Sequence, residues 1–138
     1  MSTVTAASPA LGTRTVLDAS AVVRALAYDE EEAQRWMSTV VSWPTLIYAE
    51  VGHVVLRLHR QQRLLLDDAR RSVQALHRKR ADAHRLEGLA PHAWNVALER
   101  NLTVYDACYV VLAEALDVPL VTADRPLAAA TPNAVLLS

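Results

Sequence analysis

Residues 102–128 read LTVYDACYVVLAEALDVPLVTADRPLA, and the elements that they predict indicate the fold class. Thr103 is a suitable N-cap for a helix over 104–116, which is apolar nearly all round, as is typical of a buried helix. The run 119–122 follows at once, is short and apolar, and leads to Asp124, as expected of a buried strand. A buried helix that leads directly into a buried strand is typical of an α/β protein with a parallel sheet.

The segments on either side fit the same pattern. A β-branched and apolar run over 15–17 ends at Asp18 and predicts a second buried strand. Further helices are expected over 20–27, over 44–60 with Pro44 in the first turn, from Asp67 as N-cap to about His84, and over 91–100. Two more helices are expected to begin at the acidic run 29–32 and at Pro126. Further strands are expected over 85–89 and 134–137. This alternation predicts an α/β fold with a central, mainly parallel sheet flanked by helices.

The length of 138 residues suits one domain of ordinary size. Residues 1–14 are rich in Ser, Thr and Ala without an apolar period, so we expect a loose N-terminal extension that need not be ordered. The domain itself is expected over 15–138.

Composition limits the classes of site and location. Cys108 is the single cysteine, which excludes an intrachain disulfide and a cysteine metal cluster. No apolar run reaches the roughly 18 residues that a membrane span needs, and the N-terminus lacks a charged start followed by a long apolar region. We therefore expect a cytoplasmic protein with no membrane contact.

The formal net charge is only −1, but basic side chains cluster between positions 57 and 85. This stretch contains nine basic residues and three acidic ones. The basic residues are Arg57, Arg60, Arg63, Arg70, Arg71, Arg78, Lys79, Arg80 and Arg85. Clustered arginine suits phosphate contacts because the guanidinium fork matches phosphate oxygens. The alternative is a pair of solvated helices with charged outer faces.

Four acidic residues stand in apolar surroundings. Asp18 and Asp124 each end an apolar strand, and the carboxyl ends of parallel strands meet at the edge of the sheet where ligands bind. Glu50 shares a helix face with apolar neighbours three or four residues away, and Asp106 begins a helix with almost no polar face. We expect these four carboxylates to point into one crevice.

Carboxylates about 4 Å apart repel each other by roughly 4 kcal/mol per pair at an effective dielectric near 20. They remain ionised together only if a cation joins them, and hard oxygen ligands without cysteine favour Mg²⁺ or Mn²⁺. Such a site is suited to phosphoester hydrolysis.

Three of the four acids also have a local structural explanation. Asp124 precedes Arg125 and Pro126 and can be an N-cap, residues 103–106 match a capping-box pattern, and Asp18 can belong to an ordinary strand-to-helix turn. Glu50 is the exception, because a carboxylate in mid-helix on an apolar stripe has no local backbone partner. Spacing alone leaves both explanations open.

Four segments resemble a known family. VLDASAVV (16–23), PTLIYAEVGHVV (44–55), LTVYDACYVVLAEAL (102–116) and PLVTADRPLA (119–128) resemble, in this order, the motif blocks of PIN-domain ribonucleases. The nearest branch is that of the VapC-like toxins of toxin–antitoxin pairs, and the resemblance runs from about Thr15 to the C-terminus. It implies a PIN-like domain with a parallel sheet flanked by helices.

The resemblance also implies a site and an activity. Asp18 matches the first metal-binding aspartate of the family, Glu50 the helix glutamate, Asp106 the third acid and Asp124 the fourth, with Ser20 and Thr122 where the family has small hydroxyl residues beside the acids. The implied activity is Mg²⁺- or Mn²⁺-dependent endonucleolytic cleavage of RNA. A cognate antitoxin restrains such enzymes, and homodimers are usual among them.

Our hypothesis is that Asp18, Glu50 and Asp106 hold one or two Mg²⁺ (or Mn²⁺), with Asp124 completing the site directly or through water. Contacts to the RNA backbone are assigned to Arg57, Arg60, Arg78, Lys79 and Arg80. The alternative function is a catalytically silent PIN-like module that acts mainly by binding an antitoxin or an operator.

Overall fold

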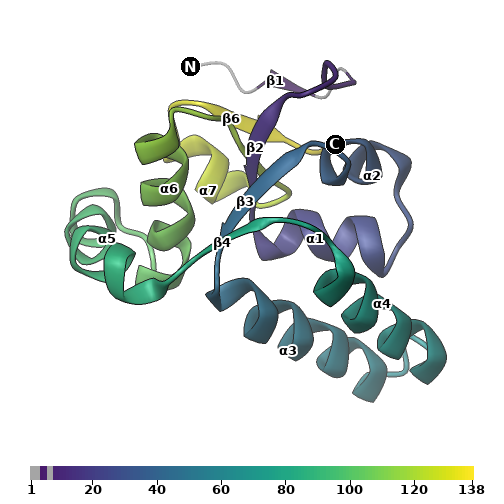
Figure 1. Ribbon diagram of the computed structural model, residues 1–138. Helices are drawn as coiled ribbons and strands as arrows, with labels where there is room; N and C mark the ends of the chain where they lie inside the picture. Colours follow the sequence, from purple (N-terminus) through teal and green to yellow (C-terminus); the bar gives the residue numbers. More distant parts are fainter. Residues whose placement is uncertain (1–3, 6–7) are drawn as a thin grey trace.

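A parallel sheet runs through the middle of the molecule, with its strands in the order β1-β6-β5-β2-β3-β4 (Figure 1). The computed structural model describes residues 4–5 and 8–138. The strands are β1 (Val4–Thr5), β2 (Arg14–Leu17), β3 (Val40–Pro44), β4 (Asp82–His84), β5 (Leu120–Thr122) and β6 (Ala134–Leu136). The helices are α1 (Ala19–Leu26), α2 (Glu31–Met37), α3 (Leu46–Arg60), α4 (Leu66–Arg78), α5 (Leu86–Arg100), α6 (Val104–Leu116) and α7 (Arg125–Ala129). The predicted α/β fold with a parallel sheet is confirmed.

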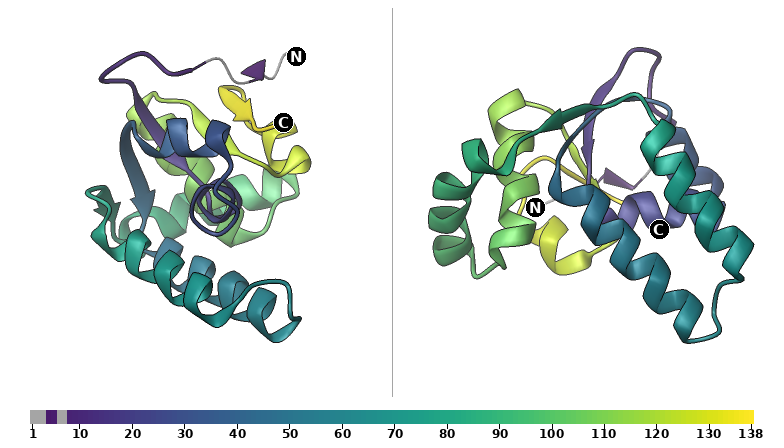
Figure 2. Two further views of the ribbon diagram at one scale, coloured as in Figure 1. Left: turned by 90° about the vertical axis from the view of Figure 1, so that its right-hand side faces the viewer. Right: turned by 60° about the horizontal axis from the view of Figure 1, so that its bottom comes forward.

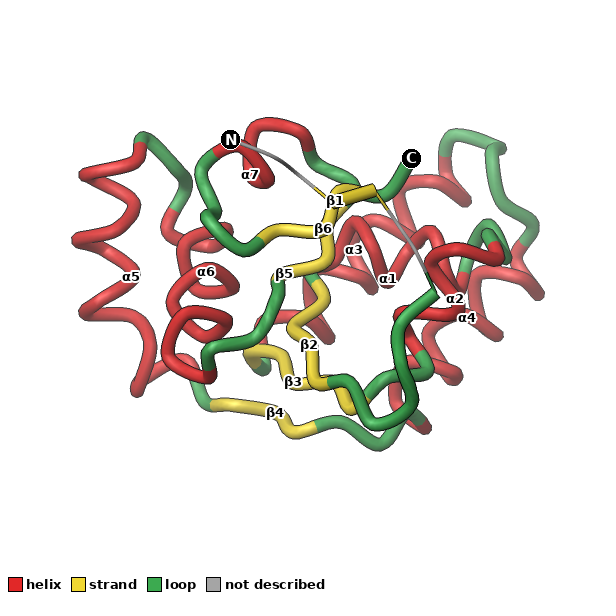
Figure 3. The backbone as a smooth tube through the Cα atoms, turned by 90° about the horizontal axis from the view of Figure 1, so that it is seen from above, coloured by secondary structure: helices red, strands yellow, loops and turns green. Residues whose placement is uncertain are grey.

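Helices cover both faces of the sheet. α5 and α6 lie on one side and α1 to α4 on the other (Figure 1, Figure 3), and α5 packs on α6 rather than on the strands. The central strands are therefore buried on both faces, so Val16, Leu17, Leu120 and Val121 are fully enclosed instead of alternating with polar residues.

The long helix α6 is central to the core. All residues from 107 to 113 are buried, as the apolar composition of this helix predicts. α3 and α4 pack together as a hairpin that extends away from the sheet (Figure 2). Its free end is the turn 61–65, which carries Arg63.

Several predicted boundaries are wrong. Pro44 ends β3 instead of opening a helix, and the segment 40–44 is a strand because it pairs with β2 through Val41 and Ser42. The strand expected over 85–89 lies instead at Asp82–His84, where an exposed edge segment without apolar alternation is held by pairing with β3.

Helix ends also differ from the prediction. α5 begins at Leu86 and contains Pro91, with the buried Leu89 in the turn before the proline. α4 begins after Leu65 and ends at Arg78, so Asp67 is not its N-cap. Asp67 and Asp68 lie in the first turn, where carboxylates favour the positive end of the helix dipole.

The predicted N-terminal extension covers residues 1–14. Residues 1–3 and 6–7 of it lie outside the described residues, Val4–Thr5 pair with β6, and Arg14 already belongs to β2. Over the ranges 4–5 and 8–138, no helix is long and apolar enough to cross a membrane.

Candidate active site

Two neighbouring strands bring Asp18 and Asp124 to the same edge of the sheet. β2 and β5 pair in parallel with Leu17 opposite Val121, and each aspartate follows the last residues of its strand. The backbone N–H of Asp18 donates to the carbonyl of Val121 at 3.2 Å, which extends the ladder to the acid itself. The carboxyl ends of β2 and β5 therefore form one rim.

Asp18 is held by three hydrogen bonds and is only 4% exposed. Its Oδ1 accepts from the Ser20 hydroxyl at 2.6 Å and from the N–H of Ala21 at 3.0 Å, and its Oδ2 accepts from the Thr122 hydroxyl at 2.6 Å. The bond from Ala21 makes Asp18 the N-cap of α1. Ser20 and Thr122, the two hydroxyl residues predicted beside the acids, both contact this carboxylate.

The same two hydroxyls also fix the loop that carries Asp124. Ser20 Oγ accepts from the N–H of Ala123 at 2.9 Å, and Thr122 Oγ1 accepts from the N–H of Asp124 at 3.0 Å. The side chain of Asp124 accepts from the N–H of Leu127 at 3.3 Å and caps α7. Asp18 and Asp124 are thus tied to each other through one small polar network.

Glu50 and Asp106 come from helices on opposite sides of the sheet. Glu50 lies in the second turn of α3 and accepts a hydrogen bond from the Tyr109 hydroxyl at 2.6 Å. Asp106 is the third residue of α6, and its N–H donates to the N-cap hydroxyl of Thr103 at 3.0 Å. Tyr109 was not predicted from the sequence, because a tyrosine within an apolar helix is indistinguishable there from a core residue.

All four acids line one open pocket of about 430 Å³. Ser20 and Tyr109 line it as well, and the basic side chains Arg24, Arg57 and Arg63 contribute to its wall together with Tyr28. The structure therefore brings the four predicted acids together, as expected from the strand ends and helix faces.

The carboxylates perturb each other. Burial raises the pKa of Asp18 from its ordinary value of 3.8 to about 6, against the hydrogen bonds that lower it. Burial and then the charge of Asp124 raise the pKa of Asp106, while burial and the charge of Asp106 raise the pKa of Glu50. The pKa shifts of Glu50 and Asp106 show that ionised carboxylates in this pocket repel one another, and a bound cation would offset that repulsion.

The donor set fits a hard divalent cation, because it consists of carboxylate oxygens without sulfur or histidine. The fit is one of donor chemistry, and the four carboxylates line the same pocket. Over the described ranges, no three acidic, histidine or cysteine side chains are grouped closely enough to share one metal ion. Hydrogen bonds hold the carboxylates of Asp18, Glu50 and Asp124 in place.

The predicted RNA-binding residues are divided among three places. Arg57 lines the acidic pocket, whereas Arg60 and Arg78 are exposed on α3 and α4. Lys79 donates to the carbonyl of Thr39 at 3.3 Å. Arg80 lies beside the starts of β3 and β4, at the amino ends of the parallel strands, whereas the acids lie at the carboxyl ends. Arg63, which was not selected from the sequence, shares the pocket with Arg57.

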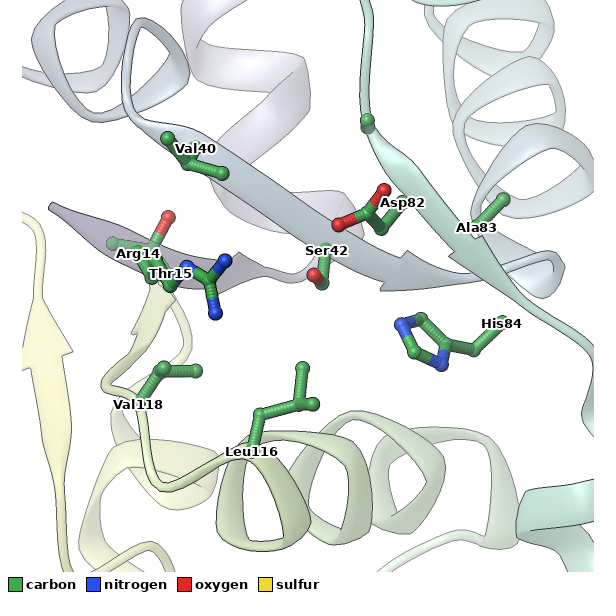
Figure 4. Close-up of a pocket in the computed structure, with 10 residues that line it drawn as sticks. Arg14, Thr15, Val40, Ser42, Asp82, Ala83, His84, Leu116 and Val118 are labelled. Atoms are coloured by element: carbon green, nitrogen blue, oxygen red, sulfur yellow. The ribbon is translucent and has the colours of Figure 1, made fainter. Parts of the chain in front are cut away.

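A second cavity of about 420 Å³ lies away from the acids (Figure 4). It is lined by residues of β2, β3 and β4 and by the end of α6, among them Arg14, Ser42, Asp82, His84 and Leu116. None of the four predicted acids lines it.

The sequence matches the family model of the PIN domain over residues 15–131. Ribonuclease VapC9 of Mycobacterium tuberculosis is 38% identical over 109 residues, which are 79% of this chain and 84% of that protein. The crystal structure of PAE2754 from Pyrobaculum aerophilum superposes with a TM-score of 0.72 at 29% identity, covering 90% of this chain and 83% of the other.

A toxin–antitoxin complex from Klebsiella pneumoniae contains a chain of the same fold, with a TM-score of 0.59 at 17% identity over 88% of this chain and 95% of the other. The match to the family model spans the elements from β2 to α7 and includes all four acids. The chain therefore belongs to the PIN domain family.

Proposed function

We propose that this protein is an endoribonuclease that acts as the toxin of a toxin–antitoxin pair. The observation that carries the proposal is the convergence of four carboxylates on one open pocket at the carboxyl edge of a parallel sheet. A relative 38% identical to this chain is named a ribonuclease. The acidic pocket suits hydrolysis of a phosphodiester, and the name of the relative supports RNA as the substrate.

In this proposal Asp18, Glu50 and Asp106 hold one or two Mg²⁺ or Mn²⁺ ions, and Asp124 completes the site directly or through water. When bound, such an ion supplies an activated water and stabilises the leaving oxygen of a phosphodiester. Cleavage of this kind leaves 5′-phosphate and 3′-hydroxyl ends.

The residues of the chain itself have distinct tasks. Ser20 and Thr122 orient Asp18 by donating to both of its oxygens, and the same hydroxyls hold the backbone beside Asp124. Preorganised ligands bind a cation without first losing side-chain freedom. The low exposure of Asp18 limits the access of bulk water to its carboxylate.

The RNA backbone would contact Arg57 and Arg63, which share the pocket with the acids. Neither arginine forms an ion pair with an acid in the part of the chain that the structure describes. Their guanidinium groups therefore remain available for phosphate oxygens on either side of the cleaved bond.

The partners belong to the same proposal. A cognate antitoxin would restrain the enzyme, and two copies of the chain would form the active particle in the cytoplasm. A chain of a toxin–antitoxin complex has the same fold as this protein.

The decisive experiment is an RNA cleavage assay on the purified protein without any partner protein. We expect cleavage with Mg²⁺ or Mn²⁺, loss of cleavage on addition of a chelator, and loss in Asp18→Asn. Asp117→Asn is the matched control, because Asp117 is an exposed carboxylate at the far end of α6. Absence of metal-dependent cleavage in the wild type would favour a silent binding module, and full activity of Asp18→Asn would refute the site.

A further inference from the structure

Tyr109 makes a contact that links two helices across the candidate site. Its ring is 1% exposed within the core, yet its hydroxyl reaches Glu50 Oε1 at 2.6 Å, over a separation of 59 residues in sequence. A hydroxyl that donates to a carboxylate at this distance forms a short, charge-assisted hydrogen bond. The bond therefore restrains Glu50 more strongly than packing alone.

Glu50 depends on this bond for its orientation. Its side chain has three rotatable bonds, and among the described residues the Tyr109 hydroxyl is the only hydrogen-bond donor found on its carboxylate. Only Oε1 is engaged, so Oε2 accepts no hydrogen bond from that part of the chain. Asp18, in contrast, is oriented by three donors of its own.

The position of Tyr109 on α6 couples two acids. Tyr109 follows Asp106 by three residues, so both side chains project from neighbouring positions on one face of the helix. Residues 107–113 are buried, which holds this helix in the core. One rigid helix thus sets the position of its own carboxylate and, through Tyr109, that of a carboxylate on α3.

We propose that Tyr109 is a positioning residue that holds Glu50 with one oxygen free for a divalent cation. This inference rests on the proposed function, since it concerns the same acidic pocket. It assigns to α6 the role toward Glu50 that Ser20 and Thr122 have toward Asp18. Tyr109 acts through Glu50 and does not contact the cation.

The test compares Mn²⁺ binding by titration calorimetry in the wild type, Tyr109→Phe and Tyr105→Phe. Tyr109→Phe removes only the hydroxyl and keeps the buried ring. We expect its affinity for Mn²⁺ to fall about 10- to 100-fold, the usual effect of removing a group that orients a metal ligand. Tyr105→Phe loses the same hydroxyl from a residue that is 62% exposed on the same helix, and its affinity should be unchanged.

Further measurements separate this inference from the proposed function. If the wild type binds no Mn²⁺, the proposed function and the inference both fail. If the wild type binds but Tyr109→Phe binds equally well, only the inference is overturned. In a Glu50→Gln background, Tyr109→Phe should weaken the remaining binding no further, and an additional 10-fold loss there would show that Tyr109 acts by another route.

A crystal structure of the wild type with Mn²⁺ provides a test that needs no variant. We expect the Tyr109 hydroxyl to remain on one oxygen of Glu50 while the ion contacts the other. A structure in which the ion has displaced the tyrosine hydroxyl from Glu50 would overturn the proposal.

Discussion

Three of the four acids have two tasks at once. Asp18 and Asp124 are the N-caps of α1 and α7, and Asp106 is the third residue of α6, so each lies at the positive end of a helix. Capping and pocket formation are therefore not competing explanations of Asp18 and Asp124, whereas Asp106 lies in the first turn of a helix that Thr103 caps. The helix N-termini stabilise carboxylates that would otherwise repel each other across the pocket.

Asp124 allows the two tasks to be separated. Asparagine is as good an N-cap as aspartate but carries no charge, whereas alanine loses the cap at a cost of about 1 kcal/mol. We expect Asp124→Asn and Asp124→Ala to lose RNA cleavage to a similar extent, while only Asp124→Ala loses about 1 kcal/mol in urea unfolding. Equal stability of the two variants would contradict a capping role in solution.

Asp18 makes the stability of the metal-free protein depend on pH. Its pKa is raised from 3.8 to about 6, so the folded state binds this proton more tightly than the unfolded chain does. Stability is then greatest below the unfolded value and is lost as pH rises through about 6, because the carboxylate ionises while buried. The loss is about 3 kcal/mol.

This loss can be measured by urea unfolding with a chelator present. The wild type should lose about 3 kcal/mol of unfolding free energy between about pH 4 and about pH 7, and Asp18→Asn should not. The stability of Asp18→Asn relative to the wild type should therefore increase by about 3 kcal/mol over this range. A difference that stays constant over this range would show that Asp18 does not titrate as the buried environment implies.

At the scale of elements, the predictable parts were those whose sequence carries its own signal. The runs 15–17 in β2, 120–122 in β5 and 107–113 in α6 are buried and largely apolar, so composition alone indicates these elements. β4 is an exposed Asp-Ala-His segment at the edge of the sheet, and its strand conformation comes from pairing with β3. No local pattern could reveal that pairing.

The residues of the site likewise differ in how far the sequence indicates them. The four acids could be predicted to lie together because strand ends and apolar helix faces are visible in the sequence, and the resemblance to a family selected them from fifteen acidic residues. Tyr109 could not be selected, because its role depends on the contact between α6 and Glu50 of α3. Arg63 belongs to the basic cluster seen in the sequence, but its place in the pocket depends on the turn between α3 and α4.

Because the middle of α6 is buried and its end is exposed, truncation of two leucines on that helix should change the free energy of unfolding by very different amounts. Leu112 is 2% exposed and Leu116 is 41% exposed. We expect Leu112→Ala to lower the free energy of unfolding by about 2 to 5 kcal/mol, because it leaves a cavity in the core. Leu116→Ala should cost less than about 1 kcal/mol. Similar losses for both, measured by urea unfolding, would contradict the placement of α6.

For the whole molecule, a cation that joins the acids would link ligand binding to folding. At a metal concentration of about 100 times Kd, we expect the free energy of unfolding to rise by about 2.7 kcal/mol over the value with chelator. Asp117→Asn should keep this gain, because its carboxylate lies at the far end of α6. Asp18→Asn should lose most of it, and an equal gain in that variant would place the cation elsewhere.

The pairing of β2 with β5 places Asp18 beside residues that follow it by more than a hundred positions in the chain. During synthesis on the ribosome, Asp18 emerges long before Thr122 and Asp124, and until then neither the strand that encloses it nor the hydroxyl that orients it is present. A nascent chain consequently has no assembled pocket. The protein becomes competent to cut RNA only after residues 120–124 have been synthesised and have paired with β2.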